Sequence, residues 1–67
     1  MNKFSERLKD LREDRGLNLT ALGKETGFSQ VAIGRWERGT QIPNIETLIV
    51  FANYFNVTAD YLLGLED

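Results

Sequence analysis

Three carboxylates, Asp10, Glu13 and Asp14, come nearest to a catalytic or metal-binding set in this sequence. No further ligand and no pocket-forming pattern accompanies them, so a solvated charged face is the better interpretation. The chain has no cysteine and no histidine, which excludes disulfides, thiolate zinc sites, cysteine nucleophiles and histidine bases. We therefore predict no enzymatic activity, no metal site and no cofactor.

Residues 29–38 carry a second group of polar side chains, which can form hydrogen bonds and include two positive charges. Ser29 is a good N-cap, and Ile33 and Trp36 share the inward face of the helix that follows it, so both are predicted core residues. The outward face carries Gln30, Val31, Gly34, Arg35 and Arg38. These outward side chains are available to a partner outside the chain.

The elements that must position this face are short helices. Cap residues and glycines divide the chain into five helical patterns, at about 3–15, 19–26, 30–38, 45–55 and 59–63. The predicted N-caps are Asn2, Asn18, Ser29, Asn44 and Thr58. Strand signals are nearly absent, because no alternating β-branched run and no hairpin turn occurs. The predicted fold class is all-α.

The middle of the chain is the most informative part. Gly23 lies inside the second helical pattern, where glycine costs about 1 kcal/mol relative to alanine, and this indicates a close backbone-to-backbone approach. Gly27, Phe28 and Ser29 then join two short helices, and a three-residue turn with glycine is the mark of a helix-turn-helix motif, here about 19–38. In this motif the first helix braces the second from behind.

Length and charge set further bounds. With 67 residues the chain is one domain, 1–67, and its net charge is −2. All eight basic residues lie between Lys3 and Arg38, whereas 41–67 holds four acids and no base. One basic and one acidic face can therefore coexist. The N-terminus lacks the apolar run of a signal peptide and no segment is apolar enough to span a bilayer, so we expect a cytoplasmic protein without membrane contact.

Over about 60 residues the sequence resembles the Xre/Cro-type helix-turn-helix family of phage and bacterial repressors. The run IGRWERG, followed by proline and ETL, is the most specific part of the match. The other matching residues are Leu8, Leu11, Arg12, Gly16, Leu17, Leu22, Gly27, Ser29, Ala52, Val57, Asp60, Leu62 and Leu63. The resemblance implies a lambda-repressor-like DNA-binding domain of five helices. It also implies a sequence-specific transcriptional regulator, a repressor, that inserts 30–38 into the major groove.

The resemblance assigns roles to individual residues. Those implied to contact bases are Gln30, Val31, Gly34 and Arg35, where the glutamine amide suits adenine and the valine a thymine methyl. Those implied to contact phosphates are Asn18, Thr20, Ser29, Arg38, Thr40 and Gln41. Arg12 and Glu37 are implied to form a structural ion pair between the first and third helices. Leu19 departs from the family, which commonly has a DNA-contacting glutamine there, so that contact is lost or passes to Thr20.

The implied partner is double-stranded DNA with a near-palindromic operator, bound by a homodimer, and no small-molecule ligand is expected. The apolar residues Val50, Tyr54, Tyr61 and Leu65 are candidates for the dimer contact. A second hypothesis is a protein-binding module, such as an antirepressor or an antitoxin-like partner, that uses the same fold. Leu19, the scarcity of basic residues after Gly39 and the net charge of −2 favour this alternative.

Overall fold

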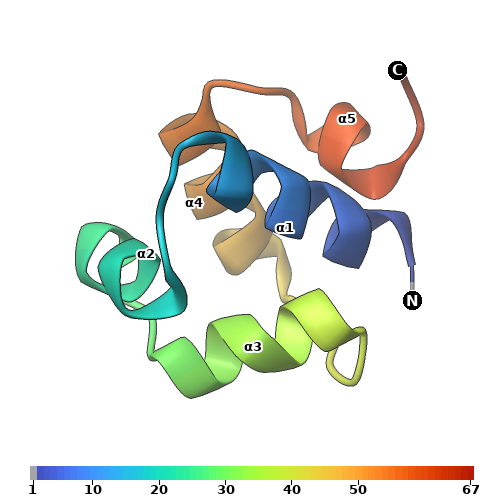
Figure 1. The fold of residues 1–67 in the computed structure, drawn as a ribbon. Helices are drawn as coiled ribbons and strands as arrows, with labels where there is room; N and C mark the ends of the chain where they lie inside the picture. Colours follow the sequence, from blue (N-terminus) through green and yellow to red (C-terminus); the bar gives the residue numbers. More distant parts are fainter. Residues whose placement is uncertain (1) are drawn as a thin grey trace.

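The predicted all-α class with five helices is confirmed in a computed structural model, which describes residues 2–67. Met1, the first residue of the predicted domain, lies outside the described residues. The helices are α1 (Lys3–Asp14), α2 (Leu19–Thr26), α3 (Gln30–Arg38), α4 (Ile45–Phe55) and α5 (Ala59–Leu63), as Figure 1 shows. No strand occurs within residues 2–67.

The helix boundaries follow from local side-chain and backbone chemistry. Each helix begins at its predicted N-cap, whose side-chain oxygen accepts a hydrogen bond from a backbone N–H three residues further on. Four helices end at a residue in the left-handed conformation: Gly27, Gly39, Asn56 and Gly64. The first helix is capped instead by Arg15 in a right-handed conformation, and Gly16 follows with φ +68°. It therefore ends one residue earlier than predicted.

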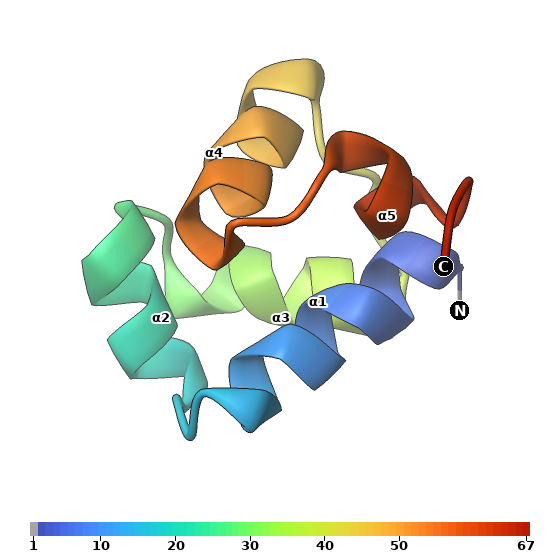
Figure 2. The ribbon, with the colours of Figure 1, turned by 90° about the horizontal axis from the view of Figure 1, so that it is seen from above.

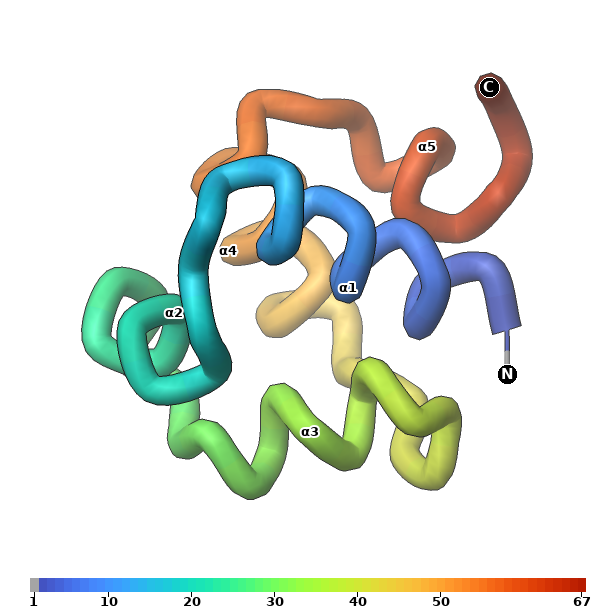
Figure 3. Tube along the Cα trace, in the orientation of Figure 1, coloured from blue at the N-terminus to red at the C-terminus, as the bar shows by residue number. Residues whose placement is uncertain are grey.

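The helices are arranged so that α3 runs along one edge of the molecule, with α2 beside its beginning and α5 on the opposite side (Figure 3). The view from above shows α1 crossing the molecule between α2 and α5, with α4 on the other side of the core (Figure 2). The beginning of α1 and the last residues of the chain lie on the same side in both views. This arrangement leaves one long face of α3 without a covering helix.

A single apolar core holds the five helices together. Its buried members come from every helix: Phe4, Leu8, Leu22, Ile33, Trp36, Phe51, Ala52, Phe55 and Leu62. Trp36 makes edge-to-face contacts with Phe28 and Phe51, with ring centroids 5.2 and 5.6 Å apart. The predicted core positions of Ile33 and Trp36 are confirmed. Within residues 2–67, the indole Nε1 of Trp36 is a buried donor without a hydrogen-bond partner.

The apolar side chains of α4 are not all buried. The sequence of this helix predicts one broad apolar face made of Ile45, Leu48, Ile49, Phe51, Ala52 and Phe55. Ile45 and Ile49 depart from that prediction, because they are 76% and 50% exposed. The core instead takes Phe51, Ala52 and Phe55 together with the hydroxyl-bearing Thr47. Because α4 is apolar on most of its circumference, the packing of α5 and α2 against it decides which side is inward, and its sequence alone does not.

Two of the residues proposed for a dimer contact are covered within the chain. The guanidinium of Arg7 lies 4.2 Å from the centre of the Tyr61 ring and also donates a hydrogen bond of 2.6 Å to the Tyr61 carbonyl. Arg15 lies 5.3 Å from the centre of the Tyr54 ring. Both tyrosines are half-buried under these cations, whereas the other two candidates, Val50 and Leu65, are 37% and 73% exposed.

Candidate nucleic-acid interface

The turn between α2 and α3 packs directly on the backbone of α2. A Cβ atom placed on Gly23 would lie 2.5 Å from the Phe28 carbonyl oxygen and 3.7 Å from the backbone nitrogen of Gln30. Gly27 provides the left-handed residue that starts the turn, with φ +85°. The predicted close backbone approach at Gly23 is confirmed, and it fixes the first turn of α3 relative to α2.

Replacing the two helical glycines one at a time tests this packing. We expect Gly23→Ala to lower the free energy of unfolding by about 1–3 kcal/mol, because a rigid carbonyl occupies the space of the new methyl group. Gly34→Ala is the matched control: its methyl would meet only the mobile end of Arg38, so the better helix propensity of alanine should raise stability by up to about 1 kcal/mol. Urea unfolding of both variants measures the difference, and equal effects would contradict the packing.

The uncovered face of α3 carries the side chains expected to contact bases. Gln30, Val31 and Arg35 are exposed, and Val31 retains 56% of its accessible surface. Ile33 and Trp36 on the opposite face are buried in the core. A helix anchored by two large apolar side chains thus presents an amide, a methyl pair and a guanidinium outward.

Gly34 does not lie open on this face, in contrast to the prediction. It is buried, because the side chain of Arg38 folds back along the helix and covers it. The Nη1 atom of Arg38 lies 3.0 Å from the position that a Cβ of Gly34 would take. The absence of a side chain at Gly34 therefore makes room for the guanidinium of Arg38, and a base edge can reach Gly34 only if that guanidinium moves away.

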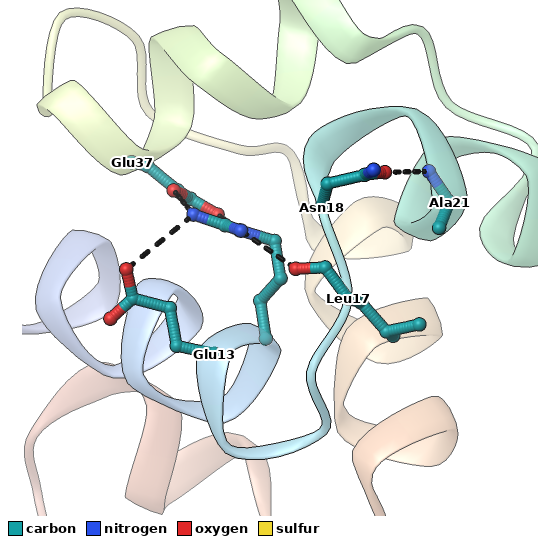
Figure 4. A network of polar contacts seen from close by, with 6 residues as sticks. Glu13, Leu17, Asn18, Ala21 and Glu37 are labelled. Carbon is teal, nitrogen blue, oxygen red and sulfur yellow. Dashed lines mark hydrogen bonds and ion pairs between the residues drawn. The ribbon is translucent and has the colours of Figure 1, made fainter.

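The pair formed by Arg12 and Glu37 joins α1 to α3. The guanidinium donates two hydrogen bonds to the Glu37 carboxylate, 2.7 Å from Nε to Oε2 and 3.0 Å from Nη2 to Oε1. It donates a third, of 2.8 Å, to the carbonyl of Leu17, and the Glu13 carboxylate lies 3.9 Å away (Figure 4). The hydrogen bonding to Glu37 raises the pKa of Arg12 above its ordinary value, although partial burial opposes it.

The pair of Arg12 and Glu37 is largely buried, with the Arg12 side chain 13% and the Glu37 side chain 8% exposed. A two-point bond between a guanidinium and a carboxylate fixes both position and orientation. It ties the last turn of α3 to α1, while the bond to Leu17 ties the same cation to the segment that leads into α2. The pair therefore sets the position of both helices of the motif.

The residues expected to contact phosphates differ in whether their side-chain hydrogen-bond donors are free or engaged within the chain. The side-chain oxygens of Asn18 and Ser29 accept from backbone N–H groups of their own helices, which leaves the Asn18 amide hydrogens and the Ser29 hydroxyl hydrogen for a partner. The hydroxyl of Thr40 donates to the Arg35 carbonyl at 3.2 Å, and that of Thr20 donates to Gln30 Oε1. These two threonine hydroxyl hydrogens are thus engaged within the chain.

One cation at this site was not singled out from the sequence. Lys9 lines a hollow of about 490 Å³ together with Leu19, Gly34, Glu37, Arg38 and Thr40. Lys9 precedes Arg12 by three residues and so shares its face of α1; this spacing was the available signal. The exposed positive charge near α3 therefore comes from α1 as well as from Arg35 and Arg38.

A family model of helix-turn-helix domains matches residues 8–62, a range that contains α2, α3 and α4. The chain belongs to the helix-turn-helix family. The resemblance deduced from the IGRWERG run is thereby confirmed, and this is a family of DNA-binding domains rather than of enzymes.

Relatives of this helix-turn-helix domain include both a transcriptional activator and a repressor. The HTH-type transcriptional activator BcrR of Enterococcus faecalis is 37% identical over 65 residues, which are 97% of this chain and 32% of BcrR. Repressor protein C2 of Salmonella phage P22 is 40% identical over 60 residues, which are 90% of this chain and 28% of that repressor. The helix-turn-helix domain described here thus spans less than a third of either relative.

One solved structure similar to this chain is that of the P22 c2 repressor in complex with a synthetic operator. It superposes with a TM-score of 0.86 at 36% sequence identity, over 94% of this chain and 96% of that chain. Among residues 2–67 of the helix-turn-helix domain, no helix is long and apolar enough to cross a membrane. In the same residues no carboxylate cluster is placed to hold a metal ion.

Proposed function

We propose that this helix-turn-helix domain is a sequence-specific DNA-binding transcriptional regulator, a repressor that acts by occupying its operator. The observation that carries the proposal is the uncovered face of α3, where Gln30 and Arg35 are exposed while Trp36 anchors the helix from behind. The similarity to a repressor bound to operator DNA, over 94% of this chain, supports the same role. Such a protein acts in the cytoplasm, where bacterial DNA lies.

Base contacts in this proposal come from Gln30, Val31 and Arg35. The glutamine amide pairs with a purine edge, the valine contacts a thymine methyl, and the arginine reaches guanine or a phosphate. Phosphate contacts come from groups with free donors, which are Asn18, Ser29, Arg38, Gln41 and Lys9. Because Thr20 and Thr40 use their hydroxyl hydrogens within the chain, their contribution to phosphate binding is expected to be smaller.

The base contacts are tested by selecting bound duplexes from a random DNA library. We expect Gln30→Ala and Arg35→Ala each to weaken specific binding by about 1–3 kcal/mol and to relax the preference at one base position. Asn53→Ala is a matched control, since it removes an exposed amide from α4 and should leave the selected sequence unchanged. Unaltered selection by both α3 variants would reject this assignment and favour the protein-binding alternative.

A homodimer is the second part of the proposal, with its contact at the beginning of α4. Exposed apolar side chains gather there around a groove of about 370 Å³, lined among others by Ile42, Pro43, Ile45 and Leu63. Ile42 and Ile45 are 79% and 76% exposed. Because this segment follows α3 directly, two copies joined at the groove would carry their α3 helices on one side of the dimer. Two helices about 34 Å apart require a near-palindromic operator.

The dimer contact is tested with two separate glutamate substitutions, one in the groove and one, as a control, outside it. We expect Ile45→Glu to abolish two-to-one binding to a palindromic duplex, because it places a carboxylate in an apolar contact. Asn53→Glu, which places the same charge at an exposed position of α4 outside the groove lining, should retain the two-to-one complex. Sedimentation of protein with duplex measures the stoichiometry. A one-to-one complex of the unaltered domain would reject the dimer.

A further inference from the structure

A hydrogen bond connects the two helices of the motif at the point where α3 begins. The hydroxyl of Thr20, in the first turn of α2, donates to Oε1 of Gln30, the first residue of α3. We propose that Thr20 is a positioning residue that fixes which end of the Gln30 amide faces the DNA, and thereby sets the base preference at that position. This inference rests on the proposed function.

The proposal follows from the two-ended chemistry of a side-chain amide. Glutamine has an acceptor oxygen and a donor nitrogen of nearly equal shape, and rotation about the last side-chain bond exchanges them. An unrestrained Gln30 can therefore offer either end to a base. A hydroxyl can donate to Oε1 or accept from Nε2, and in this structure the Thr20 hydroxyl donates to Oε1. The orientation found therefore turns the nitrogen end of the Gln30 amide away from Thr20.

The frame that holds the hydroxyl is rigid. The start of α2 is fixed by the bond of 2.8 Å from the backbone N–H of Ala21 to the Asn18 side chain. The start of α3 is fixed by the Ser29 cap and by the close packing of Gly23 against Phe28. Thr20 and Gln30 therefore meet across a distance set by the backbone.

The orientation has a chemical consequence for the DNA. With Oε1 turned toward Thr20, both amide hydrogens of Gln30 remain, and among residues 2–67 none of the hydrogen bonds in the structure uses them. A donor end matches a base that offers an acceptor in the major groove, such as N7 of adenine or guanine, whereas cytosine offers the N4 amino donor. The unaltered protein should thus discriminate against cytosine at the Gln30 position.

Two substitutions of Thr20 test the role of its hydroxyl. Thr20→Val keeps the shape of the side chain and removes the hydroxyl, whereas Thr20→Ser keeps the hydroxyl. In selection from random duplexes, we expect Thr20→Val to reduce the discrimination against cytosine by about fivefold or more, only at the position that Gln30→Ala also relaxes. Thr20→Ser should retain the discrimination, and Thr20→Val should add nothing in a Gln30→Ala background.

A second measurement on the free protein tests the bond without DNA. The order parameter of the Gln30 side-chain amide, from nitrogen-15 relaxation, should fall in Thr20→Val and stay unchanged in Thr20→Ser. Unchanged base selection by Thr20→Val, or an amide equally mobile in all three proteins, would overturn the role of Thr20 while the proposed function stands. An unaltered protein that selects no sequence would instead contradict the proposed function, and this role with it.

Discussion

Trp36→Ala is expected to leave the domain largely unfolded at room temperature. Trp36 is 5% exposed and contacts Phe28 and Phe51 at the centre of the core. Truncation of a buried tryptophan costs about 3–5 kcal/mol, through lost burial and the cavity that remains. A core of this size rarely provides more than about 3–5 kcal/mol in total. Circular dichroism during heating should show no cooperative transition for the variant.

Trp36→Phe is the matched control for the cavity. It retains an aromatic ring and removes the indole N–H, which has no hydrogen-bond partner within residues 2–67. An unpaired buried donor is itself unfavourable by about 1–3 kcal/mol, so the phenylalanine variant should lose much less stability than the alanine variant. A cooperative melt of Trp36→Ala near the midpoint of the unaltered domain would refute the core role of this side chain.

We expect Arg12→Leu to lower the free energy of unfolding nearly as much as Trp36→Ala does, although it introduces an apolar residue. The substitution leaves the Glu37 carboxylate, 8% exposed, without the guanidinium that donates two hydrogen bonds to it. Removal of one member of a buried ion pair typically costs about 3–5 kcal/mol, because the remaining charge is buried without a partner. The carbonyl of Leu17 loses its donor as well. Urea unfolding gives the loss directly.

The double variant Arg12→Leu with Glu37→Leu separates charge burial from packing. An apolar pair of similar volume is often as stable as a buried ion pair, so the second substitution should restore most of the stability lost in the first. If the double variant is less stable than Arg12→Leu alone, the unpaired carboxylate is not the cause. The DNA affinity of the double variant should remain below that of the unaltered domain, because the ion pair of Arg12 and Glu37 orients α3.

The helix boundaries were predictable because their causes are local. An N-cap such as Asn18 or Ser29 satisfies backbone groups within three residues of itself, and a glycine such as Gly27 ends a helix by its own φ. The close approach at Gly23 was also predictable, since a glycine inside a helix indicates that a side chain does not fit. The inward face of α4 was not, because several of its sides are apolar and Ile45 lies outside the core.

The site was predictable to the level of the helix face and not of single contacts. The exposure of Gln30 and Arg35 follows from the helical period and the anchoring of Trp36. The burial of Gly34 depends on the conformation of the long Arg38 side chain, which no spacing rule contains. The bond from Thr20 to Gln30 depends on the angle between α2 and α3, and the sequence gives no measure of that angle.

The most direct test of whether α3 lies in the major groove is an NMR titration of the nitrogen-15-labelled domain with its selected palindromic duplex. The quantity measured is the change in chemical shift of each backbone amide. The largest changes should fall on α3 and on the first turn of α2, beginning at Gln30 and Thr20, and only small changes on Ala59–Leu63. Changes restricted to α4 and α5, with α3 unaffected at saturating duplex, would contradict the account.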